Sequence, residues 1–325
     1  MASGSNEHRG EPMNRPGSAS NASASDRSAS STANASSKRG LAGRLRTIGD
    51  SVMITHTLFS LPFVVSAVLL ETEGRPPVSK LFWIVVAAFG ARNAANALNR
   101  IIDRDIDARN PRTASRHLPR GALSTRELWL FTAAMLALLV LGAAMLNPLC
   151  LMLLPAAGIL LFGYSYTKRF TWLSHFWLGI ACSAATMGAF LGISGTLHLR
   201  YFPLTAGVAL WVAGFDIIYA IQDIEFDRRE RLFSIPARFG EKKARLIAAA
   251  SHAGAIAGFA SVFLFWPACG AGTAVALSIC TLLIGAEHVL SLDASAHRIQ
   301  LSAYTLNQII PLVFLFGIAS DVYLI

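Results

Sequence analysis

Nine stretches of this sequence are apolar over roughly the length of a membrane-spanning helix, which needs about 20 apolar residues to cross the hydrocarbon layer. They begin at Ser51, Leu81, Leu128, Leu149, Phe176, Phe202, Leu246, Ala271 and Tyr304. The fourth stretch is shorter and meets the third at Asn147-Pro148, a turn signal that predicts a tight helical hairpin. The sequence therefore predicts an all-α integral membrane protein with nine transmembrane helices.

The amino-terminal part of the chain has a different composition. The whole sequence is 54% hydrophobic and 14% charged, whereas soluble domains carry about 25% charged residues. Gly17 to Ser37, in contrast, is dominated by Ser, Ala and Asn and has no large apolar side chain. Because such a segment cannot bury enough surface to offset its ordering entropy, residues 1–45 are predicted to be a disordered tail. Residues 46–325 are predicted to form the membrane domain.

The basic residues are distributed unevenly between the two sides of the predicted bundle. The tail and the stretches around 100–127, 164–175, 222–245 and 290–303 share one side, and together they hold 24 of the 28 lysines and arginines. The positive-inside rule therefore predicts a multi-pass protein of a bacterial-type inner (plasma) membrane, with its amino terminus cytoplasmic and its carboxyl terminus outside. This distribution explains the net charge of +9, so no nucleic-acid partner is predicted.

An acidic motif lies where the second predicted span ends. Asn99, Asp103 and Asp107 are spaced by four residues, so on a helix they would stay within roughly 80 degrees of one another. Arg92 lies seven residues before Asn99, on the same face and inside the span. An ionisable residue at that depth is costly, and we take it as a hypothesis of function.

A second acidic motif follows the sixth predicted span. Asp223 and Asp227 are four residues apart, and Tyr219 and Asp216 continue their face into the membrane. One aspartate beside basic residues is typical of a solvated helix end, but two such pairs on the same side of the bilayer favour a binding site. Carboxylate and carboxamide oxygens suit hard cations, and Mg²⁺ is usually held by one or two carboxylates together with substrate phosphates. Nearby arginines and lysines suit the same phosphates.

The two motifs resemble those of the UbiA-type family of intramembrane aromatic prenyltransferases. Asn-x3-Asp-x3-Asp matches at Asn99, Asp103 and Asp107, and Asp-x3-Asp matches at Asp223 and Asp227. The similarity extends to "HTLFSLPF" before the first motif, "NPRT" and "RHLPRG" after it, and "SIPARFG" after the second. In detail the sequence is most similar to the 4-hydroxybenzoate polyprenyltransferase branch, including bacterial members associated with menaquinone synthesis.

The resemblance implies a UbiA-like bundle of nine transmembrane helices with a cytoplasm-facing active-site cavity. It also implies Mg²⁺-dependent transfer of a polyprenyl group from an allylic polyprenyl diphosphate to the ring of a small hydroxylated aromatic acid. The acceptor would be 4-hydroxybenzoate or a related precursor of ubiquinone or menaquinone. The reaction would take place within the lipid bilayer, in a cavity that protects an allylic carbocation from water.

The resemblance also assigns roles to individual residues. Asp103, Asp107, Asp223 and Asp227 would be catalytic and, with Asn99, would bind the metal. Arg112, Arg116 and Lys168 are candidates for contacts with the diphosphate, although they fit ordinary basic residues of cytoplasmic loops equally well. Tyr219 and Asp216, on the helix face of the second motif, are candidates for the substrate side. Arg92 would pair either with the diphosphate or with the carboxylate of an aromatic acid.

Other functions fit parts of the pattern. A naphthoate, homogentisate or haem fits the pattern equally well as the acceptor, since composition does not distinguish them. A secondary transporter could use Arg92, Asp216 and Asp223 as an ion pathway, but it would place charges at mid-membrane rather than at two helix ends on one surface. Membrane CDP-alcohol phosphotransferases also use aspartates and divalent metals, yet their single Gly- and Ala-punctuated motif is absent from this sequence.

Overall fold

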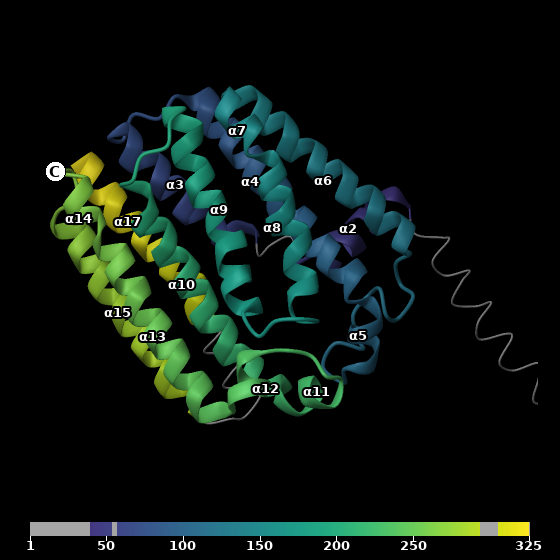
Figure 1. Ribbon diagram of the computed structural model, residues 1–325. Coiled ribbons are helices and arrows are strands. Elements are labelled where there is room, and N and C mark those ends of the chain that lie inside the picture. The colour runs from purple at the N-terminus through teal and green to yellow at the C-terminus, as the bar shows by residue number, and fades with distance from the viewer. Residues whose placement is uncertain (1–39, 54–56, 293–304, 325) are drawn as a thin grey trace, which may run out of the picture. The chain divides into compact units, whose positions relative to one another are not determined.

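The computed structural model describes residues 40–53, 57–292 and 305–324, and Figure 1 shows their arrangement. The chain divides between Leu45 and Arg46. The tail predicted over residues 1–45 lies almost entirely outside the described ranges, so its disorder stays a prediction. Within the second part, the described residues form helices and turns without any strand, which agrees with the predicted all-α class.

The helices follow one another along the chain with short connections. They are α2 (Leu41–Ser51), α3 (Thr57–Thr72), α4 (Val78–Ile102), α5 (Arg104–Arg109), α6 (Thr125–Leu146), α7 (Pro148–Met152), α8 (Leu154–Thr167), α9 (Ser174–Ser194), α10 (Tyr201–Ala220), the 3-10 helix η2 (Ile221–Asp223), α11 (Ile224–Arg229), α12 (Ile235–Phe239), α13 (Glu241–Ala260), α14 (Val262–Phe265), α15 (Ala271–Leu290) and α17 (Asn307–Leu324). The short helices α5, α11 and α12 lie at the same end of the bundle (Figure 1).

Seven segments among the described residues are long and apolar enough to cross a membrane. They contain α4, α6, α9, α10 with its continuation to Arg229, α13 with α14, α15 and α17. The other two predicted spans are helical but shorter: α3 contributes only Leu61–Thr72 as an apolar helix, and the predicted fourth span is divided into α7 and α8. Nine full spans therefore stay a prediction.

The division between α7 and α8 has a local cause. Leu153 separates the two helices, and Pro155 is the second residue of α8. A proline has no N–H to donate and its ring clashes with the carbonyl four residues earlier, so it interrupts the helix. The predicted turn before α7 is present, because the Asn147 side chain accepts a hydrogen bond of 3.0 Å from the Cys150 N–H.

The carboxyl-terminal half of the bundle is closely packed. A Cβ added to Gly258 would lie 2.5 Å from the Cα of Gly207, so α13 and α10 approach through their backbones, as small residues permit in membrane helices. Phe63 of α3 contacts the rings of Phe259 and Phe314, with centroid distances of 5.2 and 5.4 Å. Aromatic packing thus joins α3, α13 and α17, whereas the amino-terminal half of the bundle encloses a cavity.

Candidate functional site

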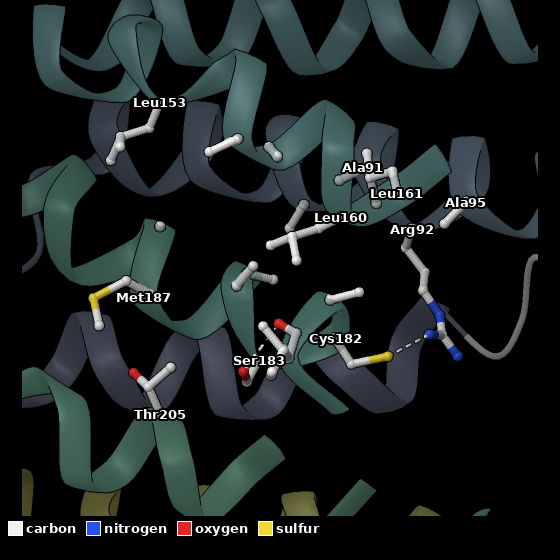
Figure 2. A pocket seen from close by; sticks show the side chains of 18 of the residues that line it. Ala91, Arg92, Ala95, Leu153, Leu160, Leu161, Cys182, Ser183, Met187 and Thr205 are labelled. Atoms are coloured by element: carbon white, nitrogen blue, oxygen red, sulfur yellow. Dashed lines mark hydrogen bonds between the residues drawn. The ribbon is translucent and has the colours of Figure 1, made fainter. Parts of the chain in front are cut away.

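An apolar cavity of about 710 Å³ lies among α4, α6, α8, α9 and α10. The face of α4 that borders it carries Ala87, Ala88, Ala91 and Ala95, at helical spacing. Because these side chains are short, the helices enclose space that larger residues would fill. Figure 2 shows Leu153, Leu160 and Leu161 among the labelled side chains of the same lining.

Arg92 brings a charge into this apolar cavity. Its Nη1 donates a 3.1 Å hydrogen bond to the Cys182 Sγ (Figure 2), and its buried Nε has no hydrogen-bond partner within the described chain. Arg92 is also the predicted site residue that lies apart from the others, because it borders the apolar cavity and not the polar pocket described next. Two helical turns separate it from Asn99, about 10 Å along α4.

A smaller, polar pocket of about 180 Å³ lies where α4 and α10 end. Its lining includes ten predicted site residues from segments far apart in the sequence, namely Asn99, Asp103, Asp107, Arg112, Arg116, Lys168, Asp216, Tyr219, Asp223 and Asp227. The fold therefore brings the two acidic motifs together. Their roles as ligands or catalysts stay predictions.

Both motifs interrupt a helix at their first aspartate, where the spacing had predicted a continuous helical face. Asp103 (φ −92°, ψ 5°) separates α4 from α5, and Asp223 (φ −101°, ψ 4°) separates α10 and η2 from α11. The helical hydrogen bonds nevertheless continue across the first break, from Asp103 N to Asn99 O (3.0 Å) and from Asp107 N to Asp103 O (2.7 Å). The three side chains therefore still face the same pocket.

The aspartates of the first motif are paired with basic residues. The Lys168 Nζ lies 2.7 Å from an Asp103 oxygen, and Asn99 donates to the same carboxylate at 2.8 Å. Arg169 lies 3.5 Å from Asp103 and also donates to the Ile102 carbonyl at the end of α4. Arg116, from the loop after α5, lies 2.6 Å from Asp107.

Residues of that same loop also reach the second motif. Arg112 donates to both oxygens of Asp223 and, at 2.9 Å, to the Tyr219 hydroxyl. Burial disfavours the charged guanidinium, but the hydrogen bond and negative charge of Asp223 outweigh burial and raise the pKa of Arg112. Asp227 instead accepts a 2.7 Å hydrogen bond from the neutral Ser234 hydroxyl. Asp223 thus forms an ion pair, whereas Asp227 forms none among the described residues.

Several residues of the site were not predicted individually. Arg169 follows Lys168, Ser234 begins "SIPARFG", and Asn110, which donates to Asp223 at 3.3 Å, begins "NPRT". The sequence segments around these residues had indicated the site, although the individual residues had not been predicted to belong to it. Tyr164 lines both the apolar cavity and the polar pocket, so it marks the place where the two meet. His175, which pairs with Asp216, had no sequence signal.

The donor atoms of the polar pocket suit a metal only in part. Within the described ranges, no three histidine, cysteine, aspartate or glutamate side chains are close enough to hold a metal ion by themselves. The pocket offers carboxylates in two pairs, and Mg²⁺ sites commonly use one or two carboxylates while water and phosphates complete the shell. The residues therefore fit a divalent cation that is bound jointly with a phosphate ligand.

A membrane-type helical bundle in which a charged pocket meets an apolar cavity is suited to an amphiphile with a charged head and an apolar chain. The model of the UbiA prenyltransferase family matches residues 60–310, more than half of the chain. The chain belongs to the UbiA prenyltransferase family, and the resemblance seen in the motifs is confirmed.

Curated relatives are similar over part of their length. The chain is 32% identical over 175 residues to the 4-hydroxybenzoate octaprenyltransferase of Neisseria gonorrhoeae, a match that covers 54% of this chain and 59% of the relative. It is 30% identical over 195 residues to the protein of the same name from Aliivibrio fischeri, covering 60% of this chain and 66% of the relative. The matches thus span less than two thirds of these relatives.

Solved structures share the fold over a larger part of the chain. The apo structure of a UbiA homolog from Aeropyrum pernix K1 has a TM-score of 0.75 and 38% sequence identity, covering 82% of this chain and 98% of that one. A UbiA homolog from Archaeoglobus fulgidus bound to GPP and Mg²⁺ has a TM-score of 0.63 and 20% identity, covering 85% and 99%. The second similarity bears on the fold alone.

Proposed function

We propose that this protein transfers a polyprenyl group from an allylic polyprenyl diphosphate to the ring of a hydroxylated aromatic acid, 4-hydroxybenzoate or a related quinone precursor. The observation that carries the proposal is that the apolar cavity and the polar pocket lie next to each other at Tyr164, which lines both. A prenyl diphosphate has the matching form, with a charged head for the polar pocket and an apolar chain for the alanine-lined cavity.

The basic residues of the polar pocket would bind the diphosphate. Arg112, Arg116 and Lys168 each pair with a motif aspartate, so they stand ready to exchange a carboxylate partner for a phosphate oxygen. Mg²⁺ held by Asn99 and the four motif aspartates would neutralise the diphosphate as it departs. Structures of Archaeoglobus fulgidus homologs bound to GPP or DMAPP and Mg²⁺ support this pairing of metal and diphosphate.

The apolar cavity would protect the reaction from water. Departure of the diphosphate leaves an allylic carbocation, which water would capture before the aromatic ring attacks. At about 710 Å³ the cavity holds a substantial part of an isoprenoid chain, in line with the 300–1,000 Å³ typical of ligand pockets.

Arg92 would bind the acceptor and not the donor. It lies in the apolar cavity and outside the polar pocket, so we assign it to the carboxylate of the aromatic acid. A guanidinium suits a carboxylate because it can donate two parallel hydrogen bonds. The names of the two relatives from Neisseria gonorrhoeae and Aliivibrio fischeri support 4-hydroxybenzoate as this acid.

The proposal includes a location. The polar pocket is formed by basic loops, around 100–127 and 222–245, which the positive-inside rule assigns to the cytoplasm. The active site would therefore face the cytoplasm from a bacterial-type inner membrane, with the carboxyl terminus outside. Cysteine labelling of intact cells at exposed Glu225 and near the carboxyl terminus would test this orientation.

The decisive experiment supplies membranes that contain the protein with a labelled polyprenyl diphosphate, Mg²⁺ and a panel of aromatic acids. The panel includes 4-hydroxybenzoate, a hydroxynaphthoate and homogentisate, and haem is tested in parallel. We expect transfer to a hydroxylated aromatic acid and its loss when the divalent metal is chelated. If the diphosphate stays intact and no acceptor is prenylated, the proposal is wrong.

A further inference from the structure

A histidine–aspartate pair lies beside the place where the two cavities meet. The His175 Nδ1 is 2.7 Å from the Asp216 Oδ2. His175 is the second residue of α9, and Asp216 lies in α10, which packs against α9. The histidine side chain is buried at 6% exposure, whereas the carboxylate is 26% exposed and borders the polar pocket.

Asp216 lies deeper in the bundle than the two acidic motifs. It precedes Asp223 by seven residues, about 10 Å along a helix. Tyr164, which lines both cavities, borders the polar pocket together with Asp216. With a diphosphate in the polar pocket and its chain in the apolar cavity, the reacting carbon would lie beside Tyr164 and therefore near Asp216.

The surroundings of Asp216 differ from those of three of the four motif aspartates. Asp103, Asp107 and Asp223 are each paired with lysine or arginine. Asp216 is paired with His175, and no lysine or arginine forms an ion pair with it in the described part of the chain. The Asp216 carboxylate is therefore not already engaged by a lysine or an arginine.

The histidine fits this site as a neutral hydrogen-bond donor. Its Nε2 is buried and has no hydrogen-bond partner among the described residues. A doubly protonated ring would leave a buried N–H unsatisfied, which is costly. The proton is therefore assigned to Nδ1, which donates to Asp216 Oδ2, and Asp216 itself lines the polar pocket.

Resting on the proposed function, we infer that Asp216 is the base that removes the ring proton of the acceptor, and that His175 is the residue that positions it. In the first step the bond between prenyl C1 and the diphosphate oxygen breaks, with its electron pair leaving on the diphosphate. The ring then forms the new carbon–carbon bond. Finally the ring C–H bond breaks, its electron pair restores aromaticity, and the proton passes to Asp216.

This assignment answers a requirement of the chemistry. A prenylated ring that keeps its proton reverts or stalls, and a cavity that excludes water offers no solvent base. Tyr219 is already an acceptor for Arg112, and the motif aspartates at the mouth of the pocket are assigned to the metal. Asp216 is the acidic residue on the substrate side of these groups.

The test separates cleavage of the diphosphate from prenylation of the ring. In purified Asp216→Asn protein, we expect ring prenylation to fall about 100- to 10,000-fold, as for loss of a general base. Cleavage of the prenyl diphosphate, which precedes the proton transfer, should fall far less, and water that enters slowly from the polar pocket would convert the stranded prenyl group to prenyl alcohol. A ring-deuterated acceptor should react more slowly than the protonated one in this variant, although both react equally with the unmodified protein.

His175 variants provide a second, independent measurement. His175→Phe keeps the ring volume but removes the donor, so ring prenylation should fall about 10- to 100-fold, the factor for a lost hydrogen bond to a charged group. His175→Asn retains a side-chain N–H near the position of Nδ1 and should restore much of that loss. Asp105→Asn, at an exposed aspartate outside both cavities, is the matched control.

Three outcomes would contradict the inference, and they are distinguishable. If Asp216→Asn lowers cleavage and prenylation equally without a ring-deuterium effect, Asp216 is not the base, while the proposed function stands. If the unmodified protein neither cleaves a polyprenyl diphosphate nor prenylates any acceptor, the proposed function is wrong, and the inference that rests on it is wrong as well. Equal activities of His175→Phe and His175→Asn would exclude the positioning role.

Discussion

The two acidic motifs have the same backbone but different electrostatic surroundings. Asp103 directly follows the long helix α4, and Asp223 ends the short 3-10 helix η2 that follows α10. The two aspartates have nearly equal dihedral angles, and a six-residue helix follows each of them. In the first motif both carboxylates face a cation, whereas in the second Asp227 is hydrogen-bonded only to the hydroxyl of Ser234. The cation that pairs with Asp223 comes from outside the second motif, since Arg112 belongs to the loop after α5.

The backbone geometry of the two motifs and the pairing of their charges have different origins. The two motifs share both the four-residue spacing and a helix break at the first aspartate. Charge neutralisation, in contrast, depends on which loops and helices lie nearby. The first motif is balanced before any ligand binds, while the second keeps a carboxylate without a cationic partner in the described residues.

Removal of the first aspartate of either motif should have the largest effect. Because both occupy the same backbone position, Asp103→Ala and Asp223→Ala should each reduce prenyl transfer by at least about 100- to 1,000-fold, the scale of losing one electrostatic group. Transfer of labelled prenyl groups measures this. Asp105→Ala and Glu225→Ala, at exposed acidic residues of the same short helices, are matched controls and should remain near full activity. Near-normal transfer by either motif variant would contradict the equivalence.

Arg112 and Arg116 should differ in their effects on donor binding. Arg112 reaches across to Asp223 and Tyr219, whereas Arg116 contacts Asp107 after its own short helix. Arg112→Ala should lower kcat/KM for the diphosphate about 10- to 100-fold, and more than Arg116→Ala does. Arg112→Lys should recover only part, because lysine cannot reproduce the planar fork. Steady-state kinetics at varied diphosphate concentration would show this order, and equal losses at both positions would refute it.

The second aspartates should differ in their contribution to stability. Asp107→Asn removes a partly buried partner of Arg116 and should lower the free energy of unfolding by about 1–2 kcal/mol. Asp227→Asn keeps an oxygen that can accept from Ser234 and removes a negative charge, so stability should stay equal or rise. Thermal unfolding of the two purified variants in the same detergent compares them. An equal decrease of the unfolding temperature in both variants would show that the ion pair does not make Asp107 contribute more to stability than Asp227.

The smallest effect is expected where the two motifs are joined at the surface. Arg109, at the end of α5, lies 2.7 Å from Glu230 after α11, and its side chain is 54% exposed. Exposed ion pairs contribute about 0.2–1 kcal/mol, so Arg109→Ala should shift unfolding only slightly, and less at high salt. A loss as large as that of Asp107→Asn would show that this contact helps to hold the motifs together.

Several features of the site were accessible from the sequence because they depend on near neighbours. The apolar runs predicted the helices, and the spacing of Asn99, Asp103 and Asp107 predicted a shared face that persists through the helix break. The Asn147-Pro148 turn was also local. The division of the fourth span at Leu153 was not predicted, although Pro155 supplied the signal.

Other features depended on contacts between distant segments. Arg92 shares a helical face with Asn99, yet two turns of helix place it in the apolar cavity and outside the acidic pocket. His175 meets Asp216 across two helices, 41 residues apart. A lone histidine near an apolar helix gives no indication of its partner, so sequence spacing alone did not reveal this pair.

The sequence by itself determined the membrane class, the family and the two acidic motifs. These properties follow from the hydrophobicity of each segment and from the spacing of residues along each helix, and both depend only on residues close together in the sequence. The tertiary structure decided which cation faces which aspartate, the size of the apolar cavity, and the position of Tyr164 between the two cavities. Those properties depend on how helices pack, because short side chains on α4 leave space that only neighbouring helices can enclose.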